Sequence, residues 1–584
     1  MDSRFLVTTA LEETWCDNQP VLFLGEWVKK YDRRHIWQSM DAVVALPFGM
    51  DSLQRERNFD YIQALSKCML VELSNALNTY HSIQYSTRQW QIILGHWLTR
   101  YVSIAFNRYF TLEQALNDCK IIGTTMLDFR AYSLSTCNSL EFIWACNDDV
   151  WNHVFFSRVL RFWEFPNADH QRPQVELTKF TQATTGSLSP KSVRSKFVGV
   201  AKKILPRLSK KNDAFIVSSY LPFKEEIKLQ LSLGQCPQWW SSPSLKNVEP
   251  DIAQRPLLSD VSKHEGFERF VRLLLREAVP SCYVEGFSNL RSTAEALPWP
   301  AQPKFIYTAN NFDLDEVFKT WAATKIAGGV PYYVGQHGAG YGTHKFFQTK
   351  YAPEREAADK FFTWGWIDSD PKNLPAYVFT IAARKTNGCP KDGGLLLIEA
   401  SPPHQLMHWD NYFEFGIFQE EQFRFVKALP REIHQLLTVR LHSAHKDFRW
   451  SDERRWDDRS PSTRIDTGVT KIRILVEQSR LVVHAYDSTG ILECLALNIP
   501  TLCFWHGGLD HLLPEARPYY KLLMDAGILL DSPERAAECV AMVWNDVEGW
   551  WAQSAVQEAR KLFCDRYARV SQYPIHDLKK MLQQ

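Results

Sequence analysis

The chemically most informative segment of this chain is the loop 487–490, Asp-Ser-Thr-Gly, which leads from an apolar run into a short helical pattern. Ser and Thr at such a position can cap the helix, and its first backbone N–H groups then point at an anion. In an open α/β sheet, ligands bind beyond the carboxyl ends of the strands, where this loop falls. We expect Asp487, Ser488 and Thr489 to bind a phosphate group, and an ordinary helix cap is the alternative.

Three more polar side chains of the C-terminal part fit the same anionic ligand. Arg440 and His442 end an apolar run, and strand alternation places both on one face. The planar fork of Arg440 suits a diphosphate or a carboxylated sugar, with simple ion pairing as the alternative. Glu493, one turn into the helix, can accept hydrogen bonds from ribose hydroxyls, or it is merely an acid near a helix N-terminus.

A glycine-rich segment, Gly-Gln-His-Gly-Ala-Gly-Tyr-Gly at 335–342, follows another apolar run. Its glycines allow backbone to approach a ligand closely. The Walker pattern is absent, and no clear Rossmann helix follows. We interpret Gln336 and Gly338 as contacts to the bound donor. His337 is then a general base or a hydrogen-bond donor to phosphate or carboxylate, and a histidine packed in a tight turn is the alternative.

The N-terminal part offers two acids, Glu12 and Glu13, on a polar loop after the first apolar run. We expect them to face the same crevice, where one carboxylate could deprotonate an acceptor hydroxyl. Solvation on the surface is the alternative for adjacent acids. Thr8 and Thr9, at the start of this loop, are assigned to substrate binding.

Asn310 and Asn311 follow the predicted strand 304–308 and are likewise assigned to substrate binding, as partners of sugar hydroxyls. The alternative is local turn chemistry, which Asn favours.

Strands that alternate with helices must position these residues, and this order predicts a mainly parallel sheet. Crowded Pro and Gly at 371–394 predict a hinge. We therefore expect a domain 1–388 on the acceptor side and a domain 389–584 that binds the nucleotide. The predicted strands are 5–8, 20–24, 214–218, 304–308, 331–335, 360–363, 395–398, 438–441, 482–483 and 502–505, and the predicted helices include 87–109, 314–327 and 415–429.

Two features of domain 1–388 concern its surface. The helix 87–109 has one apolar stripe, and His96 and Arg100 lie off it, so we expect both to be solvated. The segment 191–211 is basic and amphipathic, with no Asp or Glu. It predicts contact with an anionic membrane surface, and a mobile linker or a basic flap over the active site, about 181–213, is the alternative.

Composition bounds the function. The 584 residues carry 67 Lys and Arg against 66 Asp and Glu, so no net field favours nucleic acid. The 12 cysteines are scattered and form no C-x-x-C pair, which fits a reducing cytoplasm. No H-E-x-x-H motif or clustered His/Cys set predicts a metal site, and no cofactor is expected. Without a signal peptide or a run of about 18 apolar residues, membrane contact would be peripheral.

Three motifs together resemble a known family. Gln336-His337-Gly338 is similar to a motif of bacterial polymer transferases with the two-domain GT-B fold. Asp487-Ser488-Thr489, followed by Asn498-Ile499-Pro500-Thr501, is similar to a second motif of that group, which includes teichoic-acid glycerophosphotransferases and capsule transferases for Kdo-like sugars. With the opening 5–15, FLVTTALEETW, the chain resembles bacterial surface-polysaccharide transferases linked to nonulosonic acids such as pseudaminic acid.

This resemblance implies an α/β, GT-B-like fold with two Rossmann-like parallel-sheet domains facing a cleft. It implies a cytoplasmic glycosyltransferase that moves a nonulosonic acid from a CMP-activated nucleotide sugar to a capsular glycan or lipid-linked glycan acceptor, at the inner face of the cytoplasmic membrane. Transfer would be metal-independent and retaining, so that no general base is required. The alternatives are a glycerophosphotransferase with His337 as a true base, or a non-catalytic glycan-binding subunit of an export complex.

Overall fold

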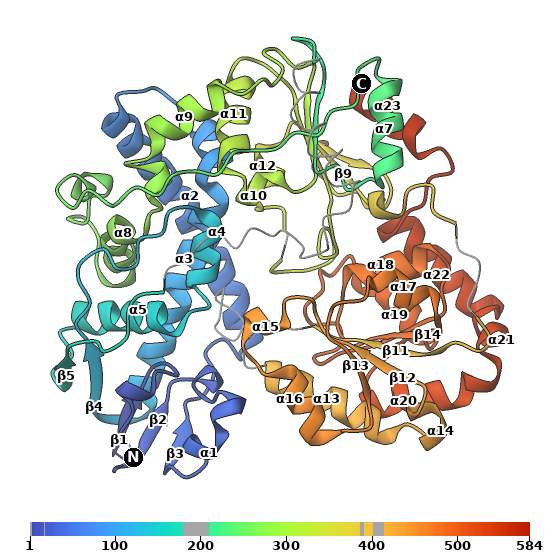
Figure 1. The fold of residues 1–584 in the computed structure, drawn as a ribbon, viewed down its shortest axis with the longest axis horizontal. Helices are drawn as coiled ribbons and strands as arrows, with labels where there is room; N and C mark the ends of the chain where they lie inside the picture. The colour runs from blue at the N-terminus through green and yellow to red at the C-terminus, as the bar shows by residue number, and fades with distance from the viewer. Residues whose placement is uncertain (1–2, 17, 179–208, 348, 386–389, 401–413) are drawn as a thin grey trace, which may run out of the picture.

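The computed structural model describes residues 3–16, 18–178, 209–347, 349–385, 390–400 and 414–584. These residues form three sheets, each parallel throughout (Figure 1). Sheet A has the order β3-β2-β1-β4-β5, sheet B has β10-β9-β8-β7-β6 and sheet C has β13-β12-β11-β14-β15-β16. The strands are β1 (Ser3–Val7), β2 (Val21–Phe23), β3 (Ala42–Val44), β4 (Lys120–Leu127), β5 (Ala168–Gln171), β6 (Phe215–Val217), β7 (Ile306–Thr308), β8 (Tyr332–Gly335), β9 (Lys360–Thr363), β10 (Asn373–Pro375), β11 (Gly394–Ile398), β12 (Leu437–Arg440), β13 (Arg464–Asp466), β14 (Ser479–His484), β15 (Thr501–Phe504) and β16 (Leu529–Leu530).

The helices surround these sheets and account for about half of the remaining described chain (Figure 1). They are α1 (Arg34–Trp37), α2 (Ser52–His81), α3 (Thr87–Asp118), α4 (Ser139–Ala145), α5 (Asp149–Phe162), α7 (Phe223–Ser232), α8 (Gly266–Ala278), α9 (Phe287–Glu295), α10 (Asn311–Leu314), α11 (Glu316–Ala327), α12 (Pro353–Ala357), α13 (Glu414–Ala428), α14 (Arg431–His434), α15 (His445–Phe448), α16 (Asp452–Arg459), α17 (Ile472–Glu477), α18 (Thr489–Ala496), α19 (Arg517–Asp525), α20 (Pro533–Val543), α21 (Val547–Trp551), α22 (Ser554–Tyr567) and α23 (Pro574–Gln583).

The predicted α/β class with parallel sheets is confirmed, and sheets B and C face each other as expected for a GT-B-like layout (Figure 1). The sequence did not indicate that residues 1–388 carry two separate sheets. In sheet A, β4 pairs with β1 on one side and with β5 on the other, although the long helix α3 separates β4 from β1 in the sequence. Such a pairing of distant segments leaves no local signal.

The hairpin of α2 and α3 lies between sheets A and B (Figure 1). A capping box starts α3, because the Ser86 side chain accepts from the Gln89 backbone while the Gln89 side chain accepts from the Ser86 backbone. The helix buries Trp90, Trp97 and Tyr101 and also much of its remaining circumference. It therefore runs nine residues beyond the predicted end at 109, as an interior helix.

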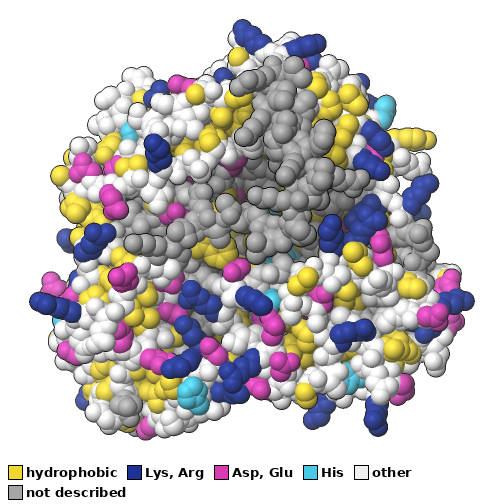
Figure 2. Space-filling view, viewed as in Figure 1, with side chains coloured by type: hydrophobic (Ala, Val, Ile, Leu, Met, Phe, Trp, Pro, Cys, Tyr) yellow, Lys and Arg dark blue, Asp and Glu magenta, His cyan; other side chains and the backbone are white. Residues whose placement is uncertain are grey.

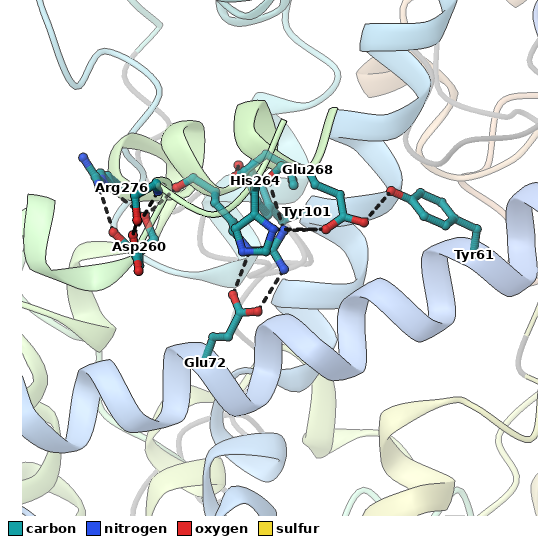
Figure 3. A network of polar contacts seen from close by, with 11 residues as sticks. Tyr61, Glu72, Tyr101, Asp260, His264, Glu268 and Arg276 are labelled. Carbon is teal, nitrogen blue, oxygen red and sulfur yellow. Dashed lines mark hydrogen bonds and ion pairs between the residues drawn. The ribbon is translucent and has the colours of Figure 1, made fainter. Parts of the chain in front are cut away.

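Helix α8 is fixed to α2 by ion pairs of Arg272 with Glu72 and Glu268, which we call the Arg272 brace. Figure 3 labels Glu72, Glu268 and Tyr61 of this network. The buried Arg272 guanidinium donates through Nε and Nη2 to the two carboxylate oxygens of Glu72 on α2, at 2.8 and 2.9 Å. Its Nη1 donates to Glu268 at 3.2 Å, and Glu268 also accepts from the Tyr61 hydroxyl at 3.4 Å. Every nitrogen of this guanidinium thus has a protein acceptor.

The chain returns from sheet C to sheet B at its end, where α23 packs against α7. The predicted hinge 371–394 is contacted by this return. It contains β10, and the Tyr377 hydroxyl donates to the Pro574 carbonyl at 2.6 Å while the Val378 N–H donates to the Arg569 carbonyl at 2.9 Å. The last helix therefore belongs with sheet B in space, although its sequence position is C-terminal.

The described surface carries basic and acidic side chains interspersed rather than in one-sign regions on the face in Figure 2. This distribution agrees with the nearly balanced composition. Among the described residues, no helix is both long and apolar enough to cross a membrane. The basic segment 191–211 lies almost wholly outside the described residues, so its predicted roles stay predictions.

Candidate functional site

The loop that follows β8, residues 336–345, is the centre of the candidate site. Gln336 was predicted to contact the donor, but its carboxamide holds this loop. Its oxygen accepts from the Trp364 backbone N–H and from the Trp366 indole N–H, both at 2.8 Å, while its nitrogen donates to the Gly338 carbonyl at 2.9 Å. Gln336 therefore holds the loop against Trp364 and Trp366. Three of the four hydrogen bonds that its carboxamide can form are made within the protein.

The loop glycines admit close approach of protein rather than of a ligand. At Gly342, which has a φ of +70°, a Cβ atom would stand 2.5 Å from the Trp366 ring. At Gly338, a Cβ atom would stand 2.9 Å from the Thr489 hydroxyl oxygen, on the opposite half of the molecule. Gly338 thus lets this loop approach the start of α18, whereas Gly342 lets it pack on Trp366, which follows β9.

His337 is half-buried and held on both sides. Its Nδ1 lies 3.2 Å from the Tyr341 hydroxyl, the ring also hydrogen-bonds to the Ala309 backbone, and the Phe312 ring packs against it at 5.7 Å. Burial lowers the pKa of His337 to about 4. The imidazole is therefore neutral near pH 7, where it is a weak base and a good neutral hydrogen-bonding group.

A cavity of about 280 Å³ opens beside this ring, and we call it the His337 pocket. Its polar wall combines the predicted residues His337 and Asn310 with four side chains that the sequence did not indicate. These four are His96 and Arg100 of α3, Asp313 of α10 and Glu354 of α12. The expectation that His96 and Arg100 are solvated is wrong, because α10, α11 and α12 pack on the side of α3 that a one-stripe helix would leave to water.

Arg100 and Asp313 form the charged pair of the pocket. The Nη2 of Arg100 donates to both carboxylate oxygens of Asp313, at 3.2 and 2.9 Å. Burial opposes ionisation of Asp313, but Arg100 and His96 outweigh it and hold the pKa of this carboxyl below its usual range. The Nε and Nη1 of Arg100 are buried and have no hydrogen-bond partner among the described residues.

Glu354 is the acid–base candidate of the pocket. Its Oε1 accepts from the Tyr341 hydroxyl at 2.5 Å, and its Oε2 lies 3.3 Å from the His96 Nε2. Burial raises the pKa of Glu354 to about 7 and lowers that of His96 to about 3. A carboxyl with a pKa near the working pH is suited to proton transfer. Tyr341 connects this carboxyl to His337.

The loop 336–345 also meets the C-terminal half, as predicted. The Ala339 N–H donates to the Thr489 hydroxyl at 3.0 Å, and the Leu513 N–H donates to the Thr343 carbonyl at 2.7 Å. Ser488 caps α18, with its hydroxyl 3.4 Å from the Ile491 N–H and 3.3 Å from the His484 Nδ1. The hydroxyls of Ser488 and Thr489 thus serve the fold, and the backbone at the start of α18 is what remains for an anion.

Asp487 lies in this seam between the two halves. Its Oδ2 is 3.0 Å from the Nε2 atoms of both His344 and His511, and its Oδ1 accepts from the Tyr520 hydroxyl at 3.2 Å. Burial would raise the pKa of Asp487, but hydrogen bonds from the two histidines hold it below its usual range. An ionised carboxylate repels phosphate, so the geometry does not support Asp487 as a phosphate ligand.

Arg440 is the last residue of β12, as predicted, whereas His442 lies two residues beyond the strand, and both have protein partners. Arg440 pairs with Asp466 at 3.2 Å and donates to the Leu441 carbonyl at 2.6 Å, while its buried Nε lacks a hydrogen-bond partner among the described residues. The His442 ring stacks on Phe448 at 5.6 Å. Burial, and then the Arg440 charge, lower the pKa of His442.

Of the three other predicted residues, Glu493 and Asn311 have protein partners. Glu493 accepts from the Thr380 hydroxyl, and burial raises its pKa. Asn311 donates to Asp315 at 2.9 Å, as a turn residue would, whereas Asn310 lines the His337 pocket.

The residues predicted in the first loop are part of the sheet A unit and do not line the His337 pocket. Glu12 forms two hydrogen bonds of 2.5 Å with Arg33, and that contact lowers its pKa. Glu12 and Glu13 lie on one short 3-10 helix, Glu12–Thr14, and Glu13 is half-buried there. Thr8 contacts His153 at 3.3 Å, and Thr9 is fully buried. The expectation that Glu12 and Glu13 share a crevice with His337 is therefore not met, because sheet A is a separate unit.

One sequence signal could have found the missed residues. His96 and Arg100 are four residues apart on one helix, so they share a face and can act on one ligand. Asp313 and Glu354 have no such signal, because only tertiary packing brings them to α3.

The fold and site define an α/β protein of GT-B-like layout with an acidic, basic and imidazole-bearing pocket beside the seam between two sheets. The chain belongs to the LIC12162 family of transferases, whose family model matches residues 4–582. No curated protein sequence matches it.

Several solved structures are similar to part of the chain. The complex of S. aureus MnaA with UDP is 15% identical, covers 52% of this chain and 83% of its own, and has a TM-score of 0.32. Acinetobacter baumannii MurG is 12% identical, covers 64% and 99%, and scores 0.30. The spinosyn rhamnosyltransferase SpnG with spinosyn aglycone is 12% identical, covers 63% and 99%, and scores 0.29.

Proposed function

We propose that this transferase is a glycosyltransferase that moves a nonulosonic acid, such as pseudaminic acid, from a CMP-activated donor to a surface polysaccharide. Family membership supports transfer. The facing sheets B and C, which meet through the loops after β8 and β14, support a donor and an acceptor brought together at that seam.

The observation that supports an acidic sugar as the substrate is the incomplete hydrogen bonding of the Arg100 guanidinium. Two nitrogens of its guanidinium are buried at the wall of the His337 pocket without protein acceptors among the described residues. An unsatisfied buried donor costs about 1–3 kcal/mol. Nε and Nη1 lie on different edges of the guanidinium, so one carboxylate cannot accept from both of them. A ligand carboxylate would accept from Nη1, while Asp313 on Nη2 holds the guanidinium in place.

Glu354 supplies the proton acceptor in this proposal. The acceptor hydroxyl attacks the anomeric carbon, the bond from that carbon to the CMP oxygen breaks, and the hydroxyl proton passes to the Glu354 carboxylate. The family resemblance predicts retention, which needs no base, whereas a base at Glu354 serves an inverting displacement. The anomeric configuration of the product, read by NMR, decides between the two.

The nucleotide is proposed to lie at the carboxyl ends of the sheet C strands. The first N–H groups of α18 and the Arg440 guanidinium can stabilise the charge on departing CMP without a metal ion at the reacting centre. His442 lies beside Arg440, and the half-buried Glu493 is left as a partner for ribose.

The direct test is mass spectrometry of a glycan acceptor incubated with the protein and a CMP-nonulosonate. We expect a mass gain of one nonulosonic acid residue, and no gain with UDP-activated neutral sugars. Thermal shifts with CMP and UDP give an independent check, since CMP should stabilise the protein more. Transfer from a UDP-sugar alone would overturn the donor assignment while leaving glycosyl transfer intact.

A glycerophosphotransferase is less well supported, because it requires His337 as a true base and burial makes this imidazole weakly basic. Transfer from CDP-glycerol would favour that reaction instead. A cytoplasmic position at the inner membrane face is also proposed, and cell fractionation tests it. Failure to bind any nucleotide would favour a non-catalytic glycan-binding subunit.

A further inference from the structure

The seam between sheets B and C contains a second cluster that the transfer reaction does not use. His344, Asp487 and His511 come from three separate segments: the loop after β8, the loop before α18 and the loop before α19. Their candidate ligand atoms all lie within 4.8 Å of one another. The His344 and His511 rings are nearly perpendicular, at 78°, with centroids 4.9 Å apart.

Both imidazoles direct the same nitrogen at the same oxygen. The Nε2 atoms of His344 and His511 each stand 3.0 Å from the Asp487 Oδ2. Donor atoms about 2.0–2.2 Å from a tetrahedral zinc ion stand about 3.3 Å apart. The two distances to Oδ2 therefore need to lengthen by only a few tenths of an ångström to surround one ion, and the candidate ligand atoms of the two histidines lie within 4.8 Å of each other.

The surroundings prepare the carboxylate for this role. The Tyr520 hydroxyl donates to the Asp487 Oδ1 at 3.2 Å, which fixes the carboxylate plane and leaves Oδ2 toward the imidazoles. Such outer hydrogen bonds orient metal ligands in proteins. Asp487 is 5% exposed, whereas His344 and His511 are 16% and 31% exposed, so solvent can reach the open side of the cluster.

We propose that His344, Asp487 and His511 bind one Zn²⁺ ion, with water as the fourth ligand, and that this ion clips sheet B to sheet C. Two imidazole nitrogens and one carboxylate suit a borderline transition ion, whereas Ca²⁺ and Mg²⁺ take oxygen ligands. The clip lies beside the contact of Ala339 with Thr489, so it would fix the seam at which donor and acceptor meet. The inference does not depend on the proposed sugar or nucleotide.

The position of the ligands explains why the sequence predicted no metal site. Residues 344, 487 and 511 show no short ligand spacing, and Asp487 was assigned to phosphate. The His344 backbone forms an isolated bridge with Leu512, and the Lys345 N–H donates to the His511 carbonyl at 2.9 Å. These contacts bring the two histidines together across the seam.

The test is calorimetric titration of the EDTA-dialysed full chain with ZnCl₂. We expect one ion per chain for the wild type. In the double variant His344→Gln/His511→Gln, the amides can still donate to Asp487 but bind zinc poorly, so we expect the Kd to weaken by about 100-fold or more. His576→Gln, at an exposed histidine on α23, is the matched control and should bind as the wild type does.

Two further measurements keep the outcome decisive if the double variant folds poorly. Tyr520→Phe should weaken zinc binding by about 10-fold or more, as loss of an outer hydrogen bond does. Co²⁺ added to the zinc-free wild type should give visible absorption bands of a four-coordinate site, and ZnCl₂ should remove them. No zinc binding by the wild type, or equal binding by the folded Gln variant, would show that the cluster is only a hydrogen-bonded contact.

Discussion

Two arginines of this protein are buried beside carboxylates, and their difference separates architecture from function. In the Arg272 brace, every guanidinium nitrogen donates to Glu72 or Glu268, so the protein alone satisfies this arginine (Figure 3). In the His337 pocket, Arg100 uses one nitrogen on Asp313 and leaves two without acceptors among the described residues.

A satisfied pair holds helices together, whereas an incompletely satisfied pair beside a cavity is a place for a ligand. The surroundings reinforce this contrast. The carboxylates of the brace are 44% and 40% exposed, while Asp313 is 23% exposed and adjoins Glu354, whose pKa burial raises to about 7. Perturbed titrating groups around a cavity are typical of catalytic sites.

The largest effect is expected from neutralising the pair in the pocket. The double variant Arg100→Gln/Asp313→Asn removes both the guanidinium that would bind the sugar carboxylate and its partner Asp313. No unpaired charge is left buried. We expect kcat/KM for transfer to fall by about 10²–10³, the usual loss when one electrostatic donor is removed. Melting temperature should change little, because both replacements can hydrogen-bond each other. Wild-type kcat/KM in a folded double variant would place the acidic sugar elsewhere.

A second large effect concerns how the free energy of unfolding depends on pH. Glu354 has a pKa of about 7 in the folded chain and an ordinary value, near 4.5, when unfolded. Between these values the folded state retains a proton that the unfolded state releases, so this group lowers stability as pH rises from about 4.5 to 7. A shift of this size corresponds to about 3 kcal/mol.

Glu354→Gln keeps a neutral side chain at every pH, so its stability curve should lack that decrease. Urea unfolding of both proteins between pH 4.5 and 8 measures the difference, which should grow with pH and then level off above about 7. Parallel curves for the two proteins would mean that Glu354 is ionised in the folded chain.

The sequence predicted the strands near the pocket well, because buried runs between helices carry their own signal. The predicted strands 331–335 and 360–363 match β8 and β9 within one residue. Sheet A was not separated from sheet B, because no local pattern shows that β4 returns to β1 after α3.

The site was predicted in part for the same reason. His337 and Asn310 follow strands directly, and this position alone indicated them. His96 and Arg100 were assigned to solvent because an amphipathic helix has one buried face, but α3 is buried on most sides. Packing of α10 and α12 against that helix, which only the folded chain shows, turns its polar residues into pocket walls.

A moderate effect on stability is expected in the Arg272 brace. Arg272→Met removes the ion pairs but keeps an apolar stem of similar length. Since Glu72 and Glu268 are partly exposed and can be solvated again, we expect a loss of about 1–2 kcal/mol in the free energy of unfolding. Transfer by the folded variant should stay within about twofold of the wild type. A rate loss comparable to that of the Arg100→Gln/Asp313→Asn variant would erase the distinction between the two arginines.

The smallest effect tests the ligand preference of the pocket directly. Pyruvate carries the 2-keto carboxylate of an open-chain nonulosonic acid, and the His337 pocket, at about 280 Å³, has room for it. At a concentration near its Kd, binding to the folded state alone stabilises by less than about 0.5 kcal/mol. We expect a small rise in melting temperature for the wild type and for Arg272→Met, and none for Arg100→Gln/Asp313→Asn. Lactamide, a neutral molecule of similar size, is the control. An equal shift in all three proteins would assign the effect to non-specific salt action. The Arg100 nitrogens that lack an acceptor among the described residues would then need another ligand.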